Sequence, residues 1–316
     1  MVKNYFRDYF SSFQLVVMIL VVMSLNGQEP RVFNTSDFQL LGKVKRCLVI
    51  TDYGKESFEF DPEGVLTKVT TLYSDTDYDV TYYRYSGGLL KEKRLENYRE
   101  DSLDRQTSLA HIYRIDTLLN KVVKESVYSY QREFLDQFEY KYDGAGNLMA
   151  IIRTTNEGID DTQISYDTLR GEVTKTIDVN GITERSVRTG EKNEKGQLLR
   201  VELEKIYLKG EPYKATESFT DTLGRKFREF KFDYDNGKSS FVKTEEINYE
   251  YDEQGFLKAK IQKSDKQESR QEFIYQFDGH NPPNWIKMII TPDNRYTTRR
   301  ITYYEEDASK TAEEEN

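Results

Sequence analysis

The sequence has 316 residues, of which 37% are hydrophobic and 32% charged, with 24 tyrosines, 17 phenylalanines and one tryptophan. Its formal net charge of −9 disfavours nucleic acid as a partner, since proteins that bind phosphate backbones present basic surfaces. The single cysteine, Cys47, excludes an internal disulfide framework and a cysteine-rich metal site. The aromatic content argues against disorder and suits β-strands with one apolar and one wet face.

Residues 1–27 have the features of a secretory signal peptide. Lys3 and Arg7 form a short basic region, and a largely apolar run from Phe13 to Leu25 follows it. A transmembrane helix needs about 20 apolar residues, so we expect cleavage near Gly27, with an uncleaved membrane anchor as the alternative. We therefore predict an exported protein in the periplasm, on the outer-membrane surface or outside the cell. After cleavage of the signal, no membrane insertion is expected.

After a polar lead at residues 28–44, residues 45–304 read as a series of β-hairpins. Asn-Gly pairs at Asn180-Gly181 and Asn236-Gly237 are strong hairpin signals. Turns at both ends of the strands predict an up-and-down antiparallel meander, and we find no convincing helix in this region. The residues that close the principal turns recur at a nearly constant spacing, which is typical of repeat proteins. They are Gly64, Gly88, Asn120, Gly146, Gly171, Gly196, Gly224, Gly255 and Asn284.

The clearest hairpin runs from Phe138 to Arg153. Aromatic residues alternate with charged ones up to Tyr142, and the turn Asp143–Asn147 carries residues suited to tight backbone geometry. Cross-strand pairs contribute about 0.2–1 kcal/mol each relative to alanine. We therefore expect the fold to be held by many weak contacts between rings on neighbouring strands.

The last hairpin and the C-terminus differ from the rest. The segment around Asn284-Trp285 contains the only tryptophan and two of the six prolines. Proline cannot donate to a β-ladder, so we predict a wider turn here that ends the regular sheet as a cap. Residues 305–316 are rich in glutamate and read as an acidic, disordered tail.

Two turns carry a recognisable motif. Tyr142-Asp143-x-x-Gly146-Asn147-Leu148 resembles the YD repeat of the RHS family, and Tyr251-Asp252-x-x-Gly255-Phe256-Leu257 matches the same pattern. The resemblance is to short, secreted RHS-like proteins of Bacteroidota type, and it covers most of residues 45–304. It implies an all-β fold, an extended and twisted antiparallel β-meander of about nine YD-like hairpin repeats that is partly curled. The chain lacks a toxin domain and the Asp-Pro-x-Gly motif that precedes one, so toxin delivery is not implied.

No motif for catalysis or metal binding stands out. The sequence contains no His-Glu-x-x-His, no Gly-x-Ser-x-Gly and no phosphate-binding glycine loop. His111 and His280 are too few for a multi-histidine metal site. Asp75, Asp77 and Asp79 lack the glycine and glutamate of an EF-hand loop, so we interpret them as a solvated turn. We predict no enzymatic activity, no metal and no cofactor.

Two sets of residues are candidates for contact or modification. Trp285, with Tyr275 and Tyr303, could form a platform for sugar rings or a protein partner, and the alternative is a ring that caps the last strand. Asp-Ser/Thr-Leu occurs four times, which resembles the O-glycosylation sequon of periplasmic Bacteroidota proteins, although the same tripeptide could simply be the turn of the repeat. The acceptor hydroxyls would be those of Ser102, Thr117, Thr168 and Thr222.

These observations predict a non-enzymatic secreted or periplasmic repeat protein that serves as a binding or structural module of the cell envelope. Its broad sheet face would contact a glycan, a surface polymer or another envelope protein. Two alternatives stay open at this point. One is an enzyme that acts on polysaccharides, which should show clustered carboxylates in a pocket. The other is an accessory protein associated with toxins or immunity, an idea that rests on the family resemblance alone.

Overall fold

The computed structural model describes residues 31–265 and 267–305. The predicted signal peptide and residues 306–316 of the predicted tail lie outside the described residues. The described chain begins with a short 3₁₀-helix, η1, and continues with twenty β-strands. Their bounds are η1 (Thr35–Phe38), β1 (Val44–Thr51), β2 (Gly54–Phe60), β3 (Leu66–Leu72), β4 (Tyr78–Ser86), β5 (Leu89–Arg99), β6 (Ser102–Asp116), β7 (Val122–Ser129), β8 (Phe134–Tyr142), β9 (Leu148–Thr155), β10 (Ile159–Leu169), β11 (Glu172–Val179), β12 (Ile182–Glu194), β13 (Gln197–Leu208), β14 (Glu211–Thr220), β15 (Lys226–Asp235), β16 (Ser240–Tyr251), β17 (Leu257–Ser264), β18 (Glu268–Phe277), β19 (Trp285–Thr291) and β20 (Arg295–Tyr303).

Aspartate side chains hold several of the turns between these strands. The Asp143 carboxylate accepts hydrogen bonds from the backbone N–H groups of Ala145 and Asn147, at 2.9 and 2.8 Å. Asp221 and Asp252 accept the equivalent bonds two and four residues further on. The glycine inside the first turn, Gly146, has a φ of +85°, which a residue with a Cβ adopts only with strain. Local chemistry therefore fixes where the chain reverses.

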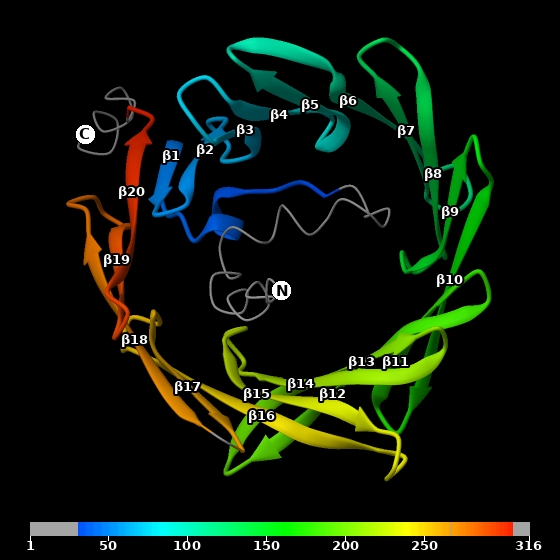
Figure 1. The fold of residues 1–316 in the computed structure, drawn as a ribbon, viewed down its shortest axis with the longest axis vertical. Coiled ribbons are helices and arrows are strands. Elements are labelled where there is room, and N and C mark those ends of the chain that lie inside the picture. Colours follow the sequence, from blue (N-terminus) through cyan, green and yellow to red (C-terminus); the bar gives the residue numbers. More distant parts are fainter. Residues whose placement is uncertain (1–30, 266, 306–316) are drawn as a thin grey trace, which may run out of the picture.

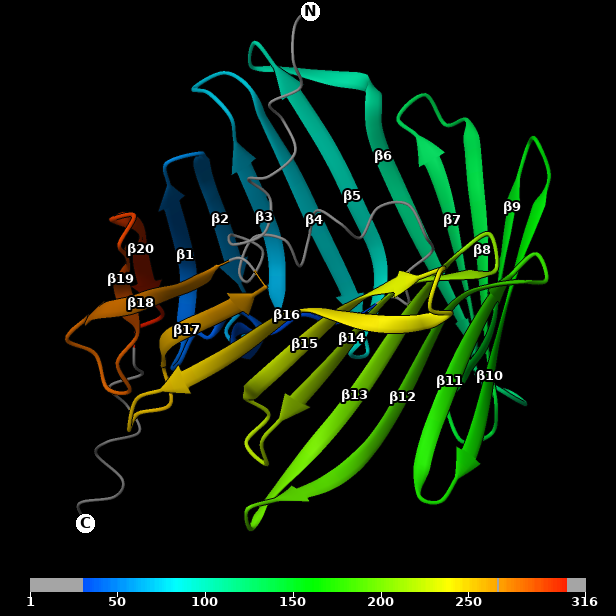
Figure 2. The ribbon, with the colours of Figure 1, turned by 60° about the horizontal axis from the view of Figure 1, so that its bottom comes forward.

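The sheet is closed into a barrel. Each strand pairs antiparallel with its neighbours along the chain, and β1 also pairs with β20, with Cys47 opposite Ile301 and Val49 opposite Arg299. Viewed along the barrel, the strands form a ring (Figure 1). The prediction of an extended, partly curled β-meander was therefore wrong, because the first and last strands hydrogen-bond to each other. Figure 2 shows β10–β16 crossing the wall obliquely, as strand tilt in a closed barrel requires.

Strand register divides the side chains into an inward and an outward set. Phe58 lies opposite Val69, which lies opposite Thr81, and these residues share a face with Tyr83. This face contacts residues 33–41, which run inside the ring (Figure 1). It is therefore the inward face. The same alternation can be followed through every strand pair around the barrel.

The apolar core lies inside one half of the barrel. Phe33, Phe38 and Leu40 of the N-terminal segment pack there against inward residues of β1–β8. The ring centroids of Phe38 and Phe58 are 4.7 Å apart, and those of Phe33 and Tyr83 are 6.3 Å apart. Burying large rings of this kind is worth about 1.5–3 kcal/mol for each side chain. The N-terminal segment is thus part of the core and fills this side of the interior.

Candidate functional site

The other half of the interior carries many polar side chains, with apolar ones such as Ile206 and Ile247 among them. On β12–β15 the inward residues Thr189, Glu202, Ser218 and Glu229 stand directly opposite one another, in a row across four strands. Lys231 contacts Glu245 through a 2.8 Å ion pair one row further along. Solvent reaches several inward side chains in this sector. The exposed polar ones include Arg185, Arg200, Glu202, Lys214 and Asp233. The barrel therefore has an apolar, filled side and a polar side that solvent reaches.

The N-terminal segment is fastened to the barrel at both of its ends. Near its start, the N–H of Thr35 donates to the carbonyl of Gly64, and Leu66 donates to Phe33. At its end, the side-chain amide of Asn284 makes two 2.8 Å hydrogen bonds with the backbone of Leu41. The segment is therefore bonded to the β2–β3 turn and to the β18–β19 turn.

A polar cluster in the β18–β19 turn holds Asn284 in place. The Asp278 carboxylate accepts hydrogen bonds from the Tyr303 hydroxyl and from the backbone N–H groups of His280 and Asn284. Partial burial raises the pKa of Asp278, but these hydrogen bonds outweigh it and the net pKa lies below the usual value. The carboxylate is therefore the stable form, and it orients the amide that fastens the N-terminal segment.

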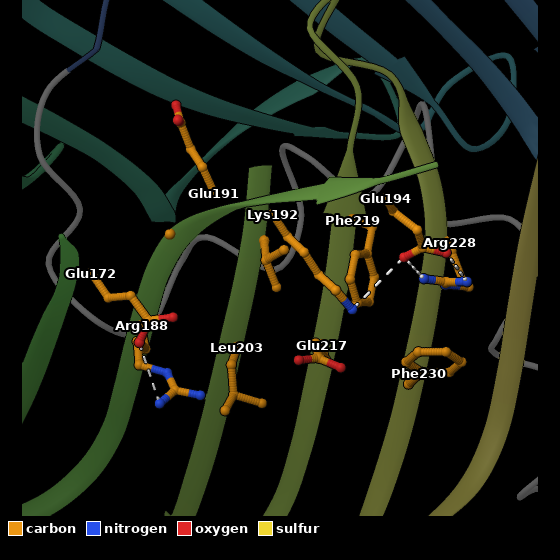
Figure 3. A pocket seen from close by; sticks show the side chains of 12 residues that line it. Glu172, Arg188, Glu191, Lys192, Glu194, Leu203, Glu217, Phe219, Arg228 and Phe230 are labelled. Carbon is orange, nitrogen blue, oxygen red and sulfur yellow. Dashed lines mark hydrogen bonds and ion pairs between the residues drawn. The ribbon is translucent and has the colours of Figure 1, made fainter. Parts of the chain in front are cut away.

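The outward face carries a pocket of about 510 Å³ over β11–β15 (Figure 3). Register builds it from two rows of side chains. Arg188, Leu203, Glu217 and Phe230 stand opposite one another in the first row. Gly190, Val201, Phe219 and Arg228 form the second row. Alternation along each strand thus gathers apolar, aromatic and charged groups on one concave surface.

Most of the charges in this pocket are paired. Arg228 makes two contacts with the Glu194 carboxylate, at 3.2 and 2.8 Å, and its guanidinium lies 4.5 Å from the Phe219 ring centroid. Lys192 lies 3.8 Å from the same carboxylate. Arg188 contacts Glu172 at 3.5 Å across the edge of the pocket. Arginine stacked on a ring while it pairs with a carboxylate is held in a fixed geometry.

Glycine at position 190 makes room for one of these ion pairs. A Cβ built there would lie 2.9 Å from Cγ of Glu172, closer than van der Waals contact allows. The Glu172 side chain therefore lies across Gly190 and reaches Arg188 beyond it (Figure 3). A single glycine inside a strand often marks such a close approach.

The aromatic residues singled out in the sequence lie inside the protein. Trp285 is 2% exposed, its ring is 6.1 Å from that of Tyr275, and the Arg299 guanidinium lies 3.4 Å from its centroid. Tyr303 hydrogen-bonds to Asp278 and accepts a bond from Asn284. A contact of these residues with a glycan or a partner stays a prediction.

The four hydroxyls proposed for glycosylation are all exposed. Ser102 begins β6 at the β5–β6 turn, and Thr117 and Thr222 lie in turns. Thr168 lies near the end of β10. Their modification also stays a prediction.

Sequence reasoning missed both the polar interior and the outward pocket. Their residues come from separate strands at alternate positions, and no short motif connects them. The alternation was a partial signal, because apolar or aromatic residues recur at many alternate positions of β13–β15, such as Val201 and Leu203 on β13. Only the closed barrel shows which of the alternating residues face the interior and which face outward.

The functional interpretation drawn from the sequence has to be corrected. A broad, open sheet face for a glycan or an envelope protein was expected, but the closed barrel turns one face of the sheet inward. The envelope binding module and its alternatives rested on that open architecture and on the RHS resemblance. The prediction that the chain does not insert into a membrane after signal cleavage was also wrong, because that reasoning considered only transmembrane helices. Closed β-barrels are the second architecture that can span a bilayer.

No family model and no curated protein matches this sequence. The resemblance to RHS proteins therefore finds no support and is corrected. Solved structures that are similar over most of the chain include two porin-like proteins. A porin-like protein from Bacteroides uniformis has 8% identity and a TM-score of 0.31, covering 82% of this chain and 98% of its own. A porin-like protein from Bacteroides vulgatus has 8% identity and a TM-score of 0.25, with coverage of 83% and 99%. Sequence identities and TM-scores this low say nothing about the function of this chain.

Within residues 31–265 and 267–305, no group of three or more histidine, cysteine, aspartate or glutamate side chains is placed to hold a metal ion. The helical part of the described chain offers no segment long and apolar enough to cross a membrane.

Proposed function

We propose that the chain is a non-enzymatic pore protein of the cell envelope, in which small polar solutes pass through the barrel along its polar wall. The observation that carries this proposal is the row of inward, polar side chains on β12–β15, with Glu202 exposed to solvent. A closed barrel with a polar interior is the architecture of a water-filled channel.

The filled half of the barrel gives this pore its shape. Residues 33–41 occupy the interior beside β1–β8 and leave the polar wall of β11–β16 opposite them (Figure 1). Solutes would therefore pass between the N-terminal segment and this wall. The mixed charges of Arg185, Arg200, Glu202 and Lys214 favour small hydrophilic solutes over apolar ones.

The outward face also differs between the two halves of the barrel. On β13–β15 it carries Val201, Leu203, Phe219 and Phe230. On β4–β8 it carries charged networks, such as Lys124 and Lys141 on either side of Glu139, at 3.0 and 3.2 Å. Because burying charges in hydrocarbon is costly, we expect water or protein to cover the β4–β8 sector. The β13–β15 sector also carries Glu217 and Arg228, so apolar and charged groups share its outward face.

Ion conductance tests the proposal directly. The purified full chain is added to planar lipid bilayers, and stepwise conductance with a measurable reversal potential in a salt gradient is expected. Glu202→Lys reverses a charge on the polar wall, so it should shift the reversal potential towards anion selectivity. The matched control is Glu246→Lys, since Glu246 lies on the outward face, where it pairs with Lys243.

Two results would overturn the proposal. One is the absence of conductance steps from protein whose β-sheet circular dichroism shows that it is folded. The other is an equal shift of the reversal potential by Glu202→Lys and Glu246→Lys, which would mean that the inward wall does not line the path.

A further inference from the structure

The outward pocket over β11–β15 is lined by four glutamates, and two of them, Glu191 and Glu217, have no ion-pair partner among the described residues. Glu217 lies in the middle of the first row, with Leu203 on one side and Phe230 on the other. Figure 3 shows its carboxylate between these two side chains, in the open part of the pocket.

The surroundings of Glu217 are apolar and aromatic. Val201, Leu203, Phe219 and Phe230 line the same surface, and Phe219 is 2% exposed. A carboxylate beside aromatic rings favours a positively charged partner, because the ring face attracts cations as the carboxylate does. The apolar side chains add area for a hydrocarbon group next to that charge.

The cations of the pocket already contact its own carboxylates and rings, and the Phe230 ring centroid lies 5.1 Å from Arg228 and 4.9 Å from Lys243. Arg228 and Lys192 are both engaged with Glu194, and Arg188 is engaged with Glu172. A ligand with a negative charge would have to compete for these paired groups and would meet Glu217 unpaired. A ligand with a positive charge meets a carboxylate that lacks an ion-pair partner in the described structure. The charge pattern therefore selects cations over anions.

We propose that this pocket is a binding site for an organic cation, a primary ammonium group attached to an apolar body. The ammonium donates to the Glu217 carboxylate, and the apolar body packs against Leu203 and Phe230. The pocket volume of about 510 Å³ lies in the range of small-molecule sites. This site lies on the outward face, so it is independent of the proposed pore.

Calorimetric titration of the folded, full chain tests this site with three matched probes. They are 2-phenylethylammonium, the uncharged 2-phenylethanol and the anionic phenylacetate. The ammonium probe should bind about tenfold more tightly than the alcohol, as expected for one charge-assisted hydrogen bond in a partly buried site. Phenylacetate should show no binding.

Variants identify the residues that bind. Glu217→Gln keeps the shape of the side chain and removes its charge, so the affinity for the ammonium probe should fall about tenfold, to that of the alcohol. Phe230→Leu should weaken both the ammonium and the alcohol, because both use the apolar surface. Glu202→Gln is the control, since Glu202 lies on the inward face of the neighbouring strand β13. It should leave all three affinities unchanged.

The proposal is overturned if the ammonium and the alcohol bind equally, if phenylacetate binds best, or if Glu217→Gln has no effect. Each variant is first shown to melt cooperatively near the temperature of the parent protein. Since these titrations do not require a bilayer, their failure would leave the conductance result standing, and the reverse holds as well.

Discussion

Asn284 and Leu41, 243 positions apart in the sequence, are joined by a pair of hydrogen bonds, each 2.8 Å long. The amide oxygen of Asn284 accepts from the Leu41 N–H, and its amide nitrogen donates to the Leu41 carbonyl. Asn284 is 2% exposed, so its side chain makes these bonds away from bulk water. This contact ties the end of the N-terminal segment to the turn between β18 and β19.

Asn284→Ala should therefore destabilise the protein by about 1–3 kcal/mol, since the Leu41 N–H and carbonyl and the Tyr303 hydroxyl lose a partner. Denaturant unfolding followed by circular dichroism measures this change. Asn156→Ala, in the exposed turn between β9 and β10, is the control and should change stability by less than about 0.5 kcal/mol. Equal effects of the two substitutions would show that the N-terminal segment is not fastened through Asn284.

Closure of the barrel predicts a particular pattern of hydrogen exchange. Backbone N–H groups of β1 and β20 are paired with each other as well as with β2 and β19. Peptides from these two strands should therefore exchange as slowly as peptides from β12 and β13, which lie within the sheet. An open sheet would instead leave about every second N–H group of β1 and β20 unpaired, and those groups would exchange within seconds. Mass spectrometry of exchanged, digested protein distinguishes the two cases.

The positions of the turns could be read from the sequence because their chemistry is local. Asp143 and Gly146 fix one reversal through hydrogen bonds and backbone geometry within five residues, and Asn180-Gly181 marks another between β11 and β12. Closure could not be read in the same way. The pairing of Cys47 with Ile301 joins strands at opposite ends of the chain, and alternation along each strand is the same in an open sheet and in a barrel.

The alternation of apolar and polar residues along a strand also does not show which face of the sheet points into the barrel. Tyr140 and Phe219 both belong to apolar rows of their strands, yet Tyr140 lies inside the barrel and Phe219 on the outward face. One contribution comes from Phe33, Phe38 and Leu40 of the N-terminal segment, which join the apolar cluster that contains Tyr140. A site such as the pocket around Glu217 depends on this assignment, so it could not be located before the fold was known.

Two glycines in turns provide a matched pair for testing backbone strain. Gly146 has a φ of +85° and no heavy atom within 4 Å of an added Cβ, whereas Gly158 has the same open space without a positive φ. Gly146→Ala should therefore cost about 1 kcal/mol through conformation alone, because L-residues disfavour this region. Gly158→Ala should be neutral or slightly stabilising, since it restricts the unfolded chain. Thermal unfolding of both variants tests this difference, and equal melting temperatures would contradict it.

The last prediction concerns pH and follows from Asp278. Its folded-state pKa is lowered, mainly because the hydrogen bonds from Tyr303 and from two backbone N–H groups outweigh the opposing effect of burial. A lowered folded pKa means that the carboxylate contributes stability above its unfolded pKa of about 3.9, and that this contribution is lost as the pH falls through the folded pKa. The Asp278→Asn variant lacks this contribution at every pH. Its melting temperature should therefore lie below that of the parent protein at pH 7, and the difference in melting temperature should narrow below about pH 4.

Asp75→Asn, in the exposed turn between β3 and β4, is the control and should follow the parent protein across the range. A gap for Asp278→Asn that stays constant from pH 7 to pH 2 would show that its effect arises from packing and that the charge of Asp278 does not stabilise the fold.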